Sequence, residues 1–187
     1  MLNDIHEIAS FTPMPDDTFM LDTNVLIKIF YPTLGTRNSA AYINLYQKIR
    51  NVNAKLLISS IQLSEFVNRC IRFQFDLYRE LHPEITNFKE HYRNTNDYQN
   101  SMNAIIEIIA NDMFPFFTKI NDNFASLNED NLLMRCFSYD FNDAVIAEIC
   151  RFQNAFLITD DRDYANYLNK LKIITNNPAL LMFKSQR

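Results

Sequence analysis

Carboxylates stand at four points of this 187-residue chain where predicted elements end or begin. Two of these points close short apolar runs: Asp22 follows residues 19–21, and the pair Asp160 and Asp161 follows residues 155–158. The carboxyl ends of parallel strands lie along one edge of a sheet, where ligands bind. Acids gathered there repel one another, so a fold keeps them together only when something neutralises them.

Two further acids complete the set. Glu65 lies about one turn into the helix predicted after the apolar run at 55–59, and Asp143 lies at the start of the helix predicted over 142–152. Hard oxygen ligands without His or Cys favour Mg²⁺ or Mn²⁺ over zinc. Such ions activate water and orient a phosphodiester, which is chemistry suited to hydrolysis of a nucleic-acid backbone.

Each acid also has a structural interpretation when it is taken alone. Asp22 can cap a helix, because Asp, Thr and Asn all serve at that position. Glu65 can lie on a solvated helix face. Asp143 is favoured at a helix N-terminus by the helix dipole, and residues 160–163 can form a solvated turn with a cap.

The pattern of elements predicts an α/β fold with three layers, in which helices flank a central, mostly parallel sheet. Strands are predicted at 19–21, 55–59, 155–158 and 172–175, and helices at 23–30, 38–49, from about 61, 142–152 and 162–171. Residues 1–17 form an N-terminal arm that packs on the domain or on a partner. Residues 18–187 form a single domain with a helical insertion at about 82–133, a stretch whose pattern contains no clear strand.

Composition excludes several classes of protein. A single glycine rules out the phosphate-binding loops GxxxxGK[ST] and GxGxxG. Cys70, Cys136 and Cys150 lack the spacing of a zinc site and are expected to be free thiols. A net charge of -4 provides no global basic field. No apolar run is long enough for a membrane span and the N-terminus lacks a basic region, so a cytoplasmic protein is expected.

Four motifs carry a family resemblance. They are Leu-Asp-Thr-Asn-Val-Leu at 21–26, Leu-Ser-Glu at 63–65, Asn-Asp-Ala-Val-Ile-Ala at 142–147 and Leu-Ile-Thr-Asp-Asp-Arg-Asp-Tyr at 157–164. In this order they resemble the PIN-domain family of metal-dependent ribonucleases, many of which in bacteria and archaea are VapC-like toxins paired with an antitoxin. The resemblance covers most of 18–177. Four carboxylates that served only as independent helix caps would not be expected to reproduce the motifs of one family in the family's order.

The resemblance implies that Asp22, Glu65 and Asp143 are catalytic and bind Mg²⁺ or Mn²⁺. The fourth acid falls in a Thr-x-Asp-x-Asp pattern. That pattern points to Asp161, with Asp163 in support, and Asp160 is the competing choice.

Other polar residues are expected to assist this site. The residues expected to support the ligating carboxylates are Thr23, Asn24, Asp140, Thr159 and Asp160. Three arginines are candidates for contacts with substrate phosphates: Arg69, Arg72 and Arg162. For the first two, a solvated face or an ion pair is the alternative, and the third can instead offset the charge of the acids.

The sequence thus predicts an endoribonuclease that acts on RNA, with an antitoxin as a candidate partner. The apolar cluster at 105–109 fills the core or supports a homodimer. The N-terminal arm and the long interval between Glu65 and Asp143 depart from the compact toxin pattern. One alternative is a catalytically silent PIN-like module that binds RNA or protein. Another is a phosphotransferase with Asp22 as nucleophile, which is disfavoured because Asn24 stands where a second Asp is expected.

Overall fold

A six-stranded sheet forms the centre of the computed structural model, which describes residues 3–34, 39–134, 140–167 and 169–183. The strand order is β1-β6-β5-β2-β3-β4, and each neighbouring pair runs parallel. The strands are β1 (Asp4–Glu7), β2 (Thr18–Leu21), β3 (Lys55–Ile58), β4 (Thr118–Lys119), β5 (Phe156–Ile158) and β6 (Lys172–Thr175). The predicted α/β fold with a parallel sheet is confirmed.

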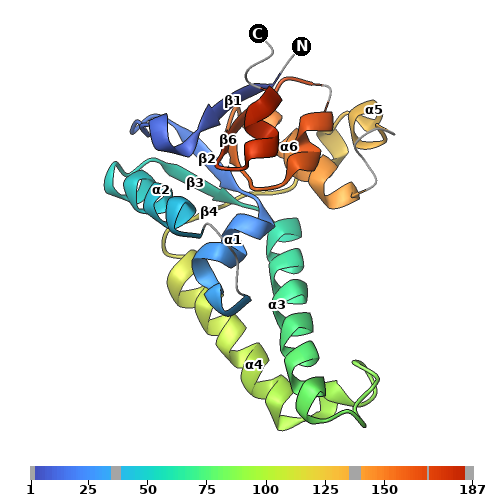
Figure 1. Ribbon diagram of the computed structural model, residues 1–187. Helices are drawn as coiled ribbons and strands as arrows, with labels where there is room; N and C mark the ends of the chain where they lie inside the picture. The colour runs from blue at the N-terminus through green and yellow to red at the C-terminus, as the bar shows by residue number, and fades with distance from the viewer. Residues whose placement is uncertain (1–2, 35–38, 135–139, 168, 184–187) are drawn as a thin grey trace.

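Helices cover both faces of this sheet (Figure 1). The α-helices are α1 (Thr23–Phe30), α2 (Ser39–Asn51), α3 (Ser60–Leu81), α4 (Asn96–Glu107), α5 (Glu129–Leu132), α6 (Phe141–Phe152) and α7 (Pro178–Leu181). The 3₁₀ helices are η1 (Ile8–Ser10), η2 (Pro32–Leu34), η3 (Tyr92–Asn94), η5 (Phe124–Ser126) and η6 (Arg162–Asn166), and a π-helix, η4 (Ile108–Met113), continues α4. Within the described residues, no helix combines the length and the apolar character that a membrane crossing requires.

Successive side chains of the strands point to opposite faces of the sheet, and this alternation divides the interior into two hydrophobic cores. On β2, Phe19 and Leu21 pack into the core formed with α1, α2, α3 and α4, whereas Met20 packs into the core formed with α6. The same division separates Ile158 from Leu157 on β5. Successive side chains of a strand point to opposite faces, and a parallel sheet is stable when both faces are covered.

The N-terminal segment contributes the edge strand β1. It pairs in parallel with β6, with Ile5 opposite Ile173. The following residue Phe11 packs edge-on against Phe156, with ring centroids 5.2 Å apart. Residues of the predicted arm therefore lie against the sheet.

Two predictions of secondary structure were wrong. The central stretch was expected to contain no strand, but Thr118 and Lys119 form β4 against Leu57 and Ile58. A two-residue exposed strand has no periodicity to detect, because its partner strand defines it. The helix predicted over 162–171 is a 3₁₀ helix that ends at Asn166.

α3 and α4 form a hairpin that extends from the sheet (Figure 1), and the insertion predicted at about 82–133 begins where α3 ends. α3 has 22 residues, so it is about 33 Å long. Its buried stripe consists of Phe66, Cys70, Ile71 and Phe75. Phe66 and Cys70, like Ile71 and Phe75, are four residues apart, which places these side chains on one face, toward α1 and α4. The hairpin is thus held by a continuation of the core on that side of the sheet.

Gln62 fixes the start of α3 to the end of β2. The side chain is fully buried. Its Oε1 accepts hydrogen bonds from Ser59 N at 2.9 Å and Ser59 Oγ at 3.1 Å, and its Nε2 donates to the carbonyl oxygen of Leu21 at 2.6 Å. One amide therefore caps α3 and joins it to the residue that precedes Asp22.

We predict that Gln62→Ala lowers the free energy of unfolding by about 2 kcal/mol, because the substitution leaves buried backbone groups of Ser59 and Leu21 without partners. Thermal unfolding followed by circular dichroism should show a fall in Tm of about 4–8 °C for a chain of this size. Gln99→Ala, at an exposed position of α4, is the matched control and should leave Tm unchanged. Equal Tm values for both variants would contradict the anchoring role.

Candidate metal centre

Asp22 lies at the junction of β2 and α1, and only 2% of it is exposed. Its Oδ1 accepts a hydrogen bond from Thr23 N at 2.7 Å. Its Oδ2 accepts from Asn24 Nδ2 and from Thr159 Oγ1, each at 2.7 Å. Three neutral donors therefore orient this carboxylate.

Burial makes the negative charge of Asp22 costly. The pKa of Asp22 is raised from 3.8 to about 7: burial is the largest cause, the hydrogen bond from Thr159 opposes it, and the charges of Glu65 and Asp161 add to it. Near pH 7 the buried carboxyl is therefore poised between its protonated and ionised forms. A cation bound beside it would favour the ionised form.

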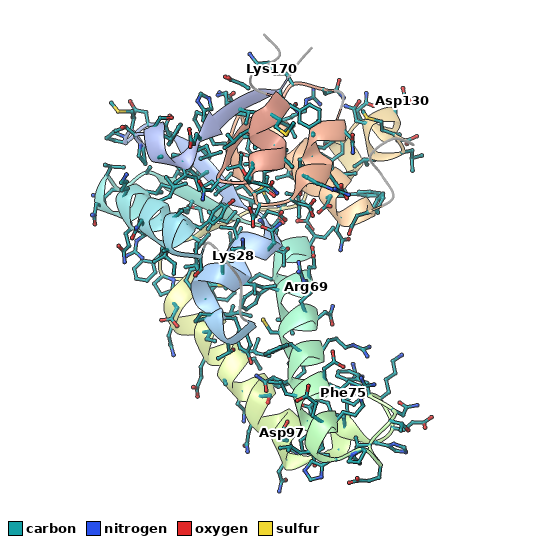
Figure 2. All side chains as sticks on the ribbon, in the orientation of Figure 1. Lys28, Arg69, Phe75, Asp97, Asp130 and Lys170 are labelled. Atoms are coloured by element: carbon teal, nitrogen blue, oxygen red, sulfur yellow. The ribbon has the colours of Figure 1, made fainter. Side chains whose placement is uncertain are left out.

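Glu65 reaches the same region from α3. Its Oε2 accepts a hydrogen bond from Thr23 Oγ1 at 3.0 Å, so Thr23 donates its backbone N–H to Asp22 and its hydroxyl to Glu65. Arg69, one turn further along α3 (Figure 2), has its Nη1 3.6 Å from Glu65 Oε1. Because Gln62 anchors the first turn of α3, the position of Glu65 follows from that of β2.

Asp143 lies in the first turn of α6, on the other side of the sheet. Its Oδ1 accepts a hydrogen bond from the hydroxyl of Tyr164 at 3.2 Å. The pKa of Asp143 is raised from 3.8 to about 8, mainly by burial. Four other carboxylates contribute to this rise, in the order Asp22, Asp140, Asp161 and Glu65. The acids predicted from the sequence therefore share one electrostatic neighbourhood.

Asp160 and Asp161, although adjacent, have different surroundings. Asp160 forms an ion pair with Lys28 and accepts a hydrogen bond from the hydroxyl of Tyr42 at 2.8 Å. Lys28, on α1 (Figure 2), is 5% exposed. A buried Lys requires a partner, and this pair neutralises the charge of Asp160.

Asp161 is joined to Asp22 through one hydroxyl. Its backbone N–H donates to Thr159 Oγ1 at 2.9 Å, the same oxygen that donates to Asp22. Its Oδ1 accepts from Asp163 N at 2.9 Å. The side chain of Asp163 is 65% exposed, and it is the backbone of Asp163 that orients Asp161.

The remaining predicted residues lie at the margin of the site or away from it. Asp140 is exposed and caps α6. Arg162 is also exposed, with its Nε 3.7 Å from Asp163 Oδ1. The guanidinium of Arg72 lies over the ring of Phe88 in the insertion, 3.8 Å from the ring centroid.

The structure brings Asp22, Glu65, Asp143 and Asp161 together. In the part of the chain that the structure describes, no three Asp, Glu, His or Cys side chains already form a cage for a metal ion. Each of the four carboxylates instead accepts a hydrogen bond from a protein donor.

Four residues that act on these acids were not anticipated from the sequence: Lys28, Tyr42, Gln62 and Tyr164. Two of them carry a signal. Lys28 interrupts the apolar pattern of its helix, and Gln62 stands three residues after Ser59, the spacing of a capping box. Tyr42 and Tyr164 are ordinary core aromatics in sequence, and only the fold brings their hydroxyls to the acids.

Comparisons with known proteins agree with this architecture. Residues 19–169 match the family model of the PIN domain. A chain in the crystal structure of VapBC2 from Rickettsia felis, bound to a DNA fragment from its promoter, is 16% identical with a TM-score of 0.52; the match covers 84% of this chain and 98% of that one. A chain of FitAcB from Neisseria gonorrhoeae is also 16% identical, with a TM-score of 0.46 and coverage of 82% and 96%. No curated protein sequence matches the chain significantly.

We predict that Asp143→Asn raises the Tm of the metal-free protein above pH 8. The pKa of this carboxyl is raised on folding from 3.8 to about 8, so ionisation opposes folding. The penalty is absent below the unfolded pKa, grows as pH rises and is complete above the folded pKa.

Thermal unfolding in EDTA should therefore show a gain of a few degrees for this variant at about pH 9 and no gain at about pH 3. Asp130→Asn, at an exposed position of α5, should change Tm at neither pH. A gain for Asp143→Asn that is the same at both pH values would contradict the electrostatic cause.

Proposed function

This chain belongs to the PIN domain family, whose members are typically nucleases, and we propose that it is an endoribonuclease that hydrolyses RNA phosphodiester bonds with Mg²⁺ or Mn²⁺. The observation that carries the proposal is the convergence of four carboxylates at one edge of the sheet, where the pKa of Asp22 rises to about 7 and that of Asp143 to about 8. Perturbed acids of this kind cluster at functional sites.

The donor set fits a hard divalent cation. All four candidate ligands, Asp22, Glu65, Asp143 and Asp161, offer carboxylate oxygens, which Mg²⁺ and Mn²⁺ prefer. Asp22 Oδ2 accepts two hydrogen bonds, whereas one oxygen of each of the four carboxylates accepts a single hydrogen bond and keeps a lone pair for a cation. Within the described residues, Asp22 and Asp143 form no ion pair with Lys or Arg. No basic side chain there neutralises their negative charge, so a bound cation can do so.

A divalent ion held by these acids would supply the positive charge that orients a phosphodiester, activates water and stabilises the leaving oxygen. The chain's own groups prepare that chemistry. Neutral donors hold Asp22, Thr23 positions Glu65 and the hydroxyl of Tyr164 positions Asp143. Because Thr23, Thr159 and Tyr164 are themselves buried, the acids are preorganised.

We assign the fourth position to Asp161. Asp160 has Lys28 and Tyr42 as partners, which supports a structural role for it in fixing the loop. Asp161 shares the hydroxyl of Thr159 with Asp22, which supports a role beside the other acids.

A substrate phosphate would meet positive charge beside the acids. Arg69 is half exposed and lies 3.6 Å from Glu65, so its remaining N–H groups can donate to a phosphate oxygen while the pair is retained. Exposed Arg162 is the second candidate from the same edge.

The alternative is a catalytically silent PIN-like module that binds RNA or protein. Calorimetry with Mn²⁺ separates the two possibilities. The nuclease proposal requires divalent binding that Glu65→Gln weakens, and a silent module requires none.

We predict that Asp22→Asn and Asp143→Asn each lower the rate of RNA cleavage about a hundredfold or more, because one charged ligand is lost from the metal centre. The measurement is cleavage of end-labelled RNA in Mg²⁺ and in Mn²⁺, with EDTA as the blank. Asp161→Asn should have an effect of the same order if Asp161 is the fourth ligand.

Asp130→Asn removes the same charge at an exposed position of α5 and should cleave RNA at the wild-type rate. Wild-type protein that cleaves no RNA with either ion would overturn the proposal. So would Asp22→Asn and Asp143→Asn variants with full activity.

We also propose an antitoxin partner, on the strength of the family and of the likeness to a VapBC2 chain. Expression of the chain alone should arrest growth of its host, and expression of Asp143→Asn should not, because arrest by RNA cleavage requires the intact site. Growth that continues with active wild-type enzyme would count against a toxin role while leaving the nuclease proposal intact.

A further inference from the structure

The distal half of the α3–α4 hairpin contains a rigid group of aromatic rings, which we name the distal cluster. It consists of Phe75, Tyr78, Phe88, Tyr92 and Tyr98. The ring of Tyr92 lies 5.2 Å from Phe75, 5.3 Å from Tyr78 and 5.7 Å from Phe88. Tyr92 is fully buried, and its hydroxyl donates to Asp97 Oδ2 at 2.7 Å. Phe88 therefore has a fixed position beside α3.

Two arginines lie over Phe88. The guanidinium carbon of Arg72 is 3.8 Å from the ring centroid, and that of Arg93 is 5.3 Å from it. Both side chains are exposed, and neither forms an ion pair with a carboxylate of the described residues. Arg79 differs, since its Nη2 lies 3.5 Å from Asp76 Oδ1.

Stacking prepares these two guanidiniums for an anion. An aromatic face attracts the cation and holds its plane, while the N–H groups at the edge stay free to donate. A phosphate accepts two such bonds in the fork geometry of Arg. Because the side chains are already restrained, binding costs less conformational entropy than it does for a free surface Lys.

The same face of α3 connects this surface to the acids. Glu65, Arg69 and Arg72 are spaced by four and three residues, so they follow one stripe of the helix. Seven residues correspond to a rise of about 10 Å. Figure 2 shows Arg69 on α3 between the sheet and the distal cluster, which Phe75 marks. A strand with one phosphate at the carboxylates therefore has another within reach of Arg72.

We propose that Arg72 and Arg93, which lie over Phe88, form an RNA-binding exosite that holds the backbone a few nucleotides from the scissile phosphate. This inference rests on the proposed nuclease function and adds a preference for substrates long enough to span both sites. It also explains how a chain with a net charge of -4 retains a polyanion, because the positive charge is local and free of acidic partners.

The test is binding of single-stranded RNA in EDTA, where no cleavage occurs, followed by fluorescence anisotropy. Arg72→Gln/Arg93→Gln should weaken binding of an oligonucleotide of about 16 nucleotides by about tenfold or more. The slope of log K against log[salt] should fall by about 1.4, the value for two lost phosphate contacts on a single strand. A dinucleotide, which has a single internal phosphate, should lose less affinity, because it cannot place one phosphate at each site.

The matched control is Lys48→Gln/Arg50→Gln, which removes two charges from α2, including an arginine that lies over Phe116. It should keep the wild-type affinity and salt slope. Arg72→Lys keeps the charge without the planar stack and should show an intermediate loss. Tm values establish that each variant is folded.

Equal losses for both double variants, or no loss for Arg72→Gln/Arg93→Gln, would overturn the exosite. Binding of poly-glutamate, but not of RNA, that depends on Arg72 and Arg93 would also overturn it in favour of an acidic protein partner. A cleavage assay distinguishes failure of the exosite from failure of the proposed function. If wild-type protein cleaves RNA and Arg72→Gln/Arg93→Gln binds RNA as tightly as wild type, the exosite fails and the nuclease proposal stands. If wild-type protein neither binds nor cleaves RNA, the proposed function fails.

Discussion

Negative charge gathered at the end of a parallel sheet is the constraint on which the arrangement of this protein depends. β5, β2 and β3 are neighbours, so their carboxyl ends bring the loop after Ile158, Asp22 and the start of α3 to one place. Burial there opposes ionisation, as the raised pKa values of Asp22 and Asp143 indicate. Hydrogen bonds from Thr23, Asn24 and Thr159 offset part of this cost, and a divalent cation would offset the rest.

Two consecutive residues of the loop after β5, Asp160 and Asp161, lie in different electrostatic environments. Asp160 is neutralised by Lys28 on α1 and bound by Tyr42 on α2, which ties the loop to that helical layer. Asp161 is connected instead to Asp22 through Thr159. The ion pair of Asp160 with Lys28 holds the loop in place, while the neighbouring Asp161, which pairs with no Lys or Arg of the described residues, stays available for a ligand.

Much of this could be predicted from sequence, because the central strands are continuous apolar runs and the acids follow them directly. The convergence of Asp22 with the loop after β5 follows from the topology of a parallel sheet. β1 and β4 were missed, and the helix predicted over 162–171 is a shorter 3₁₀ helix, since tertiary contacts rather than periodicity define such short elements. Strand geometry does not distinguish Asp160 from Asp161, although the Thr-x-Asp-x-Asp pattern favours Asp161. The different surroundings of Asp160 come from Lys28 and Tyr42, which are more than a hundred residues away in sequence.

The continuity of α3 has a consequence for how the hairpin relates to the sheet. One helix runs without interruption from the cap at Ser59 to Leu81, so Glu65 and the distal cluster are related by helical phase as well as by length. An insertion of one residue between them would turn the distal surface by about 100° relative to the acids, whereas an insertion of seven would almost restore its direction and move it about 10 Å further away. The number of residues between Glu65 and Arg72 therefore sets both the distance and the direction of the distal surface relative to the acids, and in this chain it places them on a common face of α3.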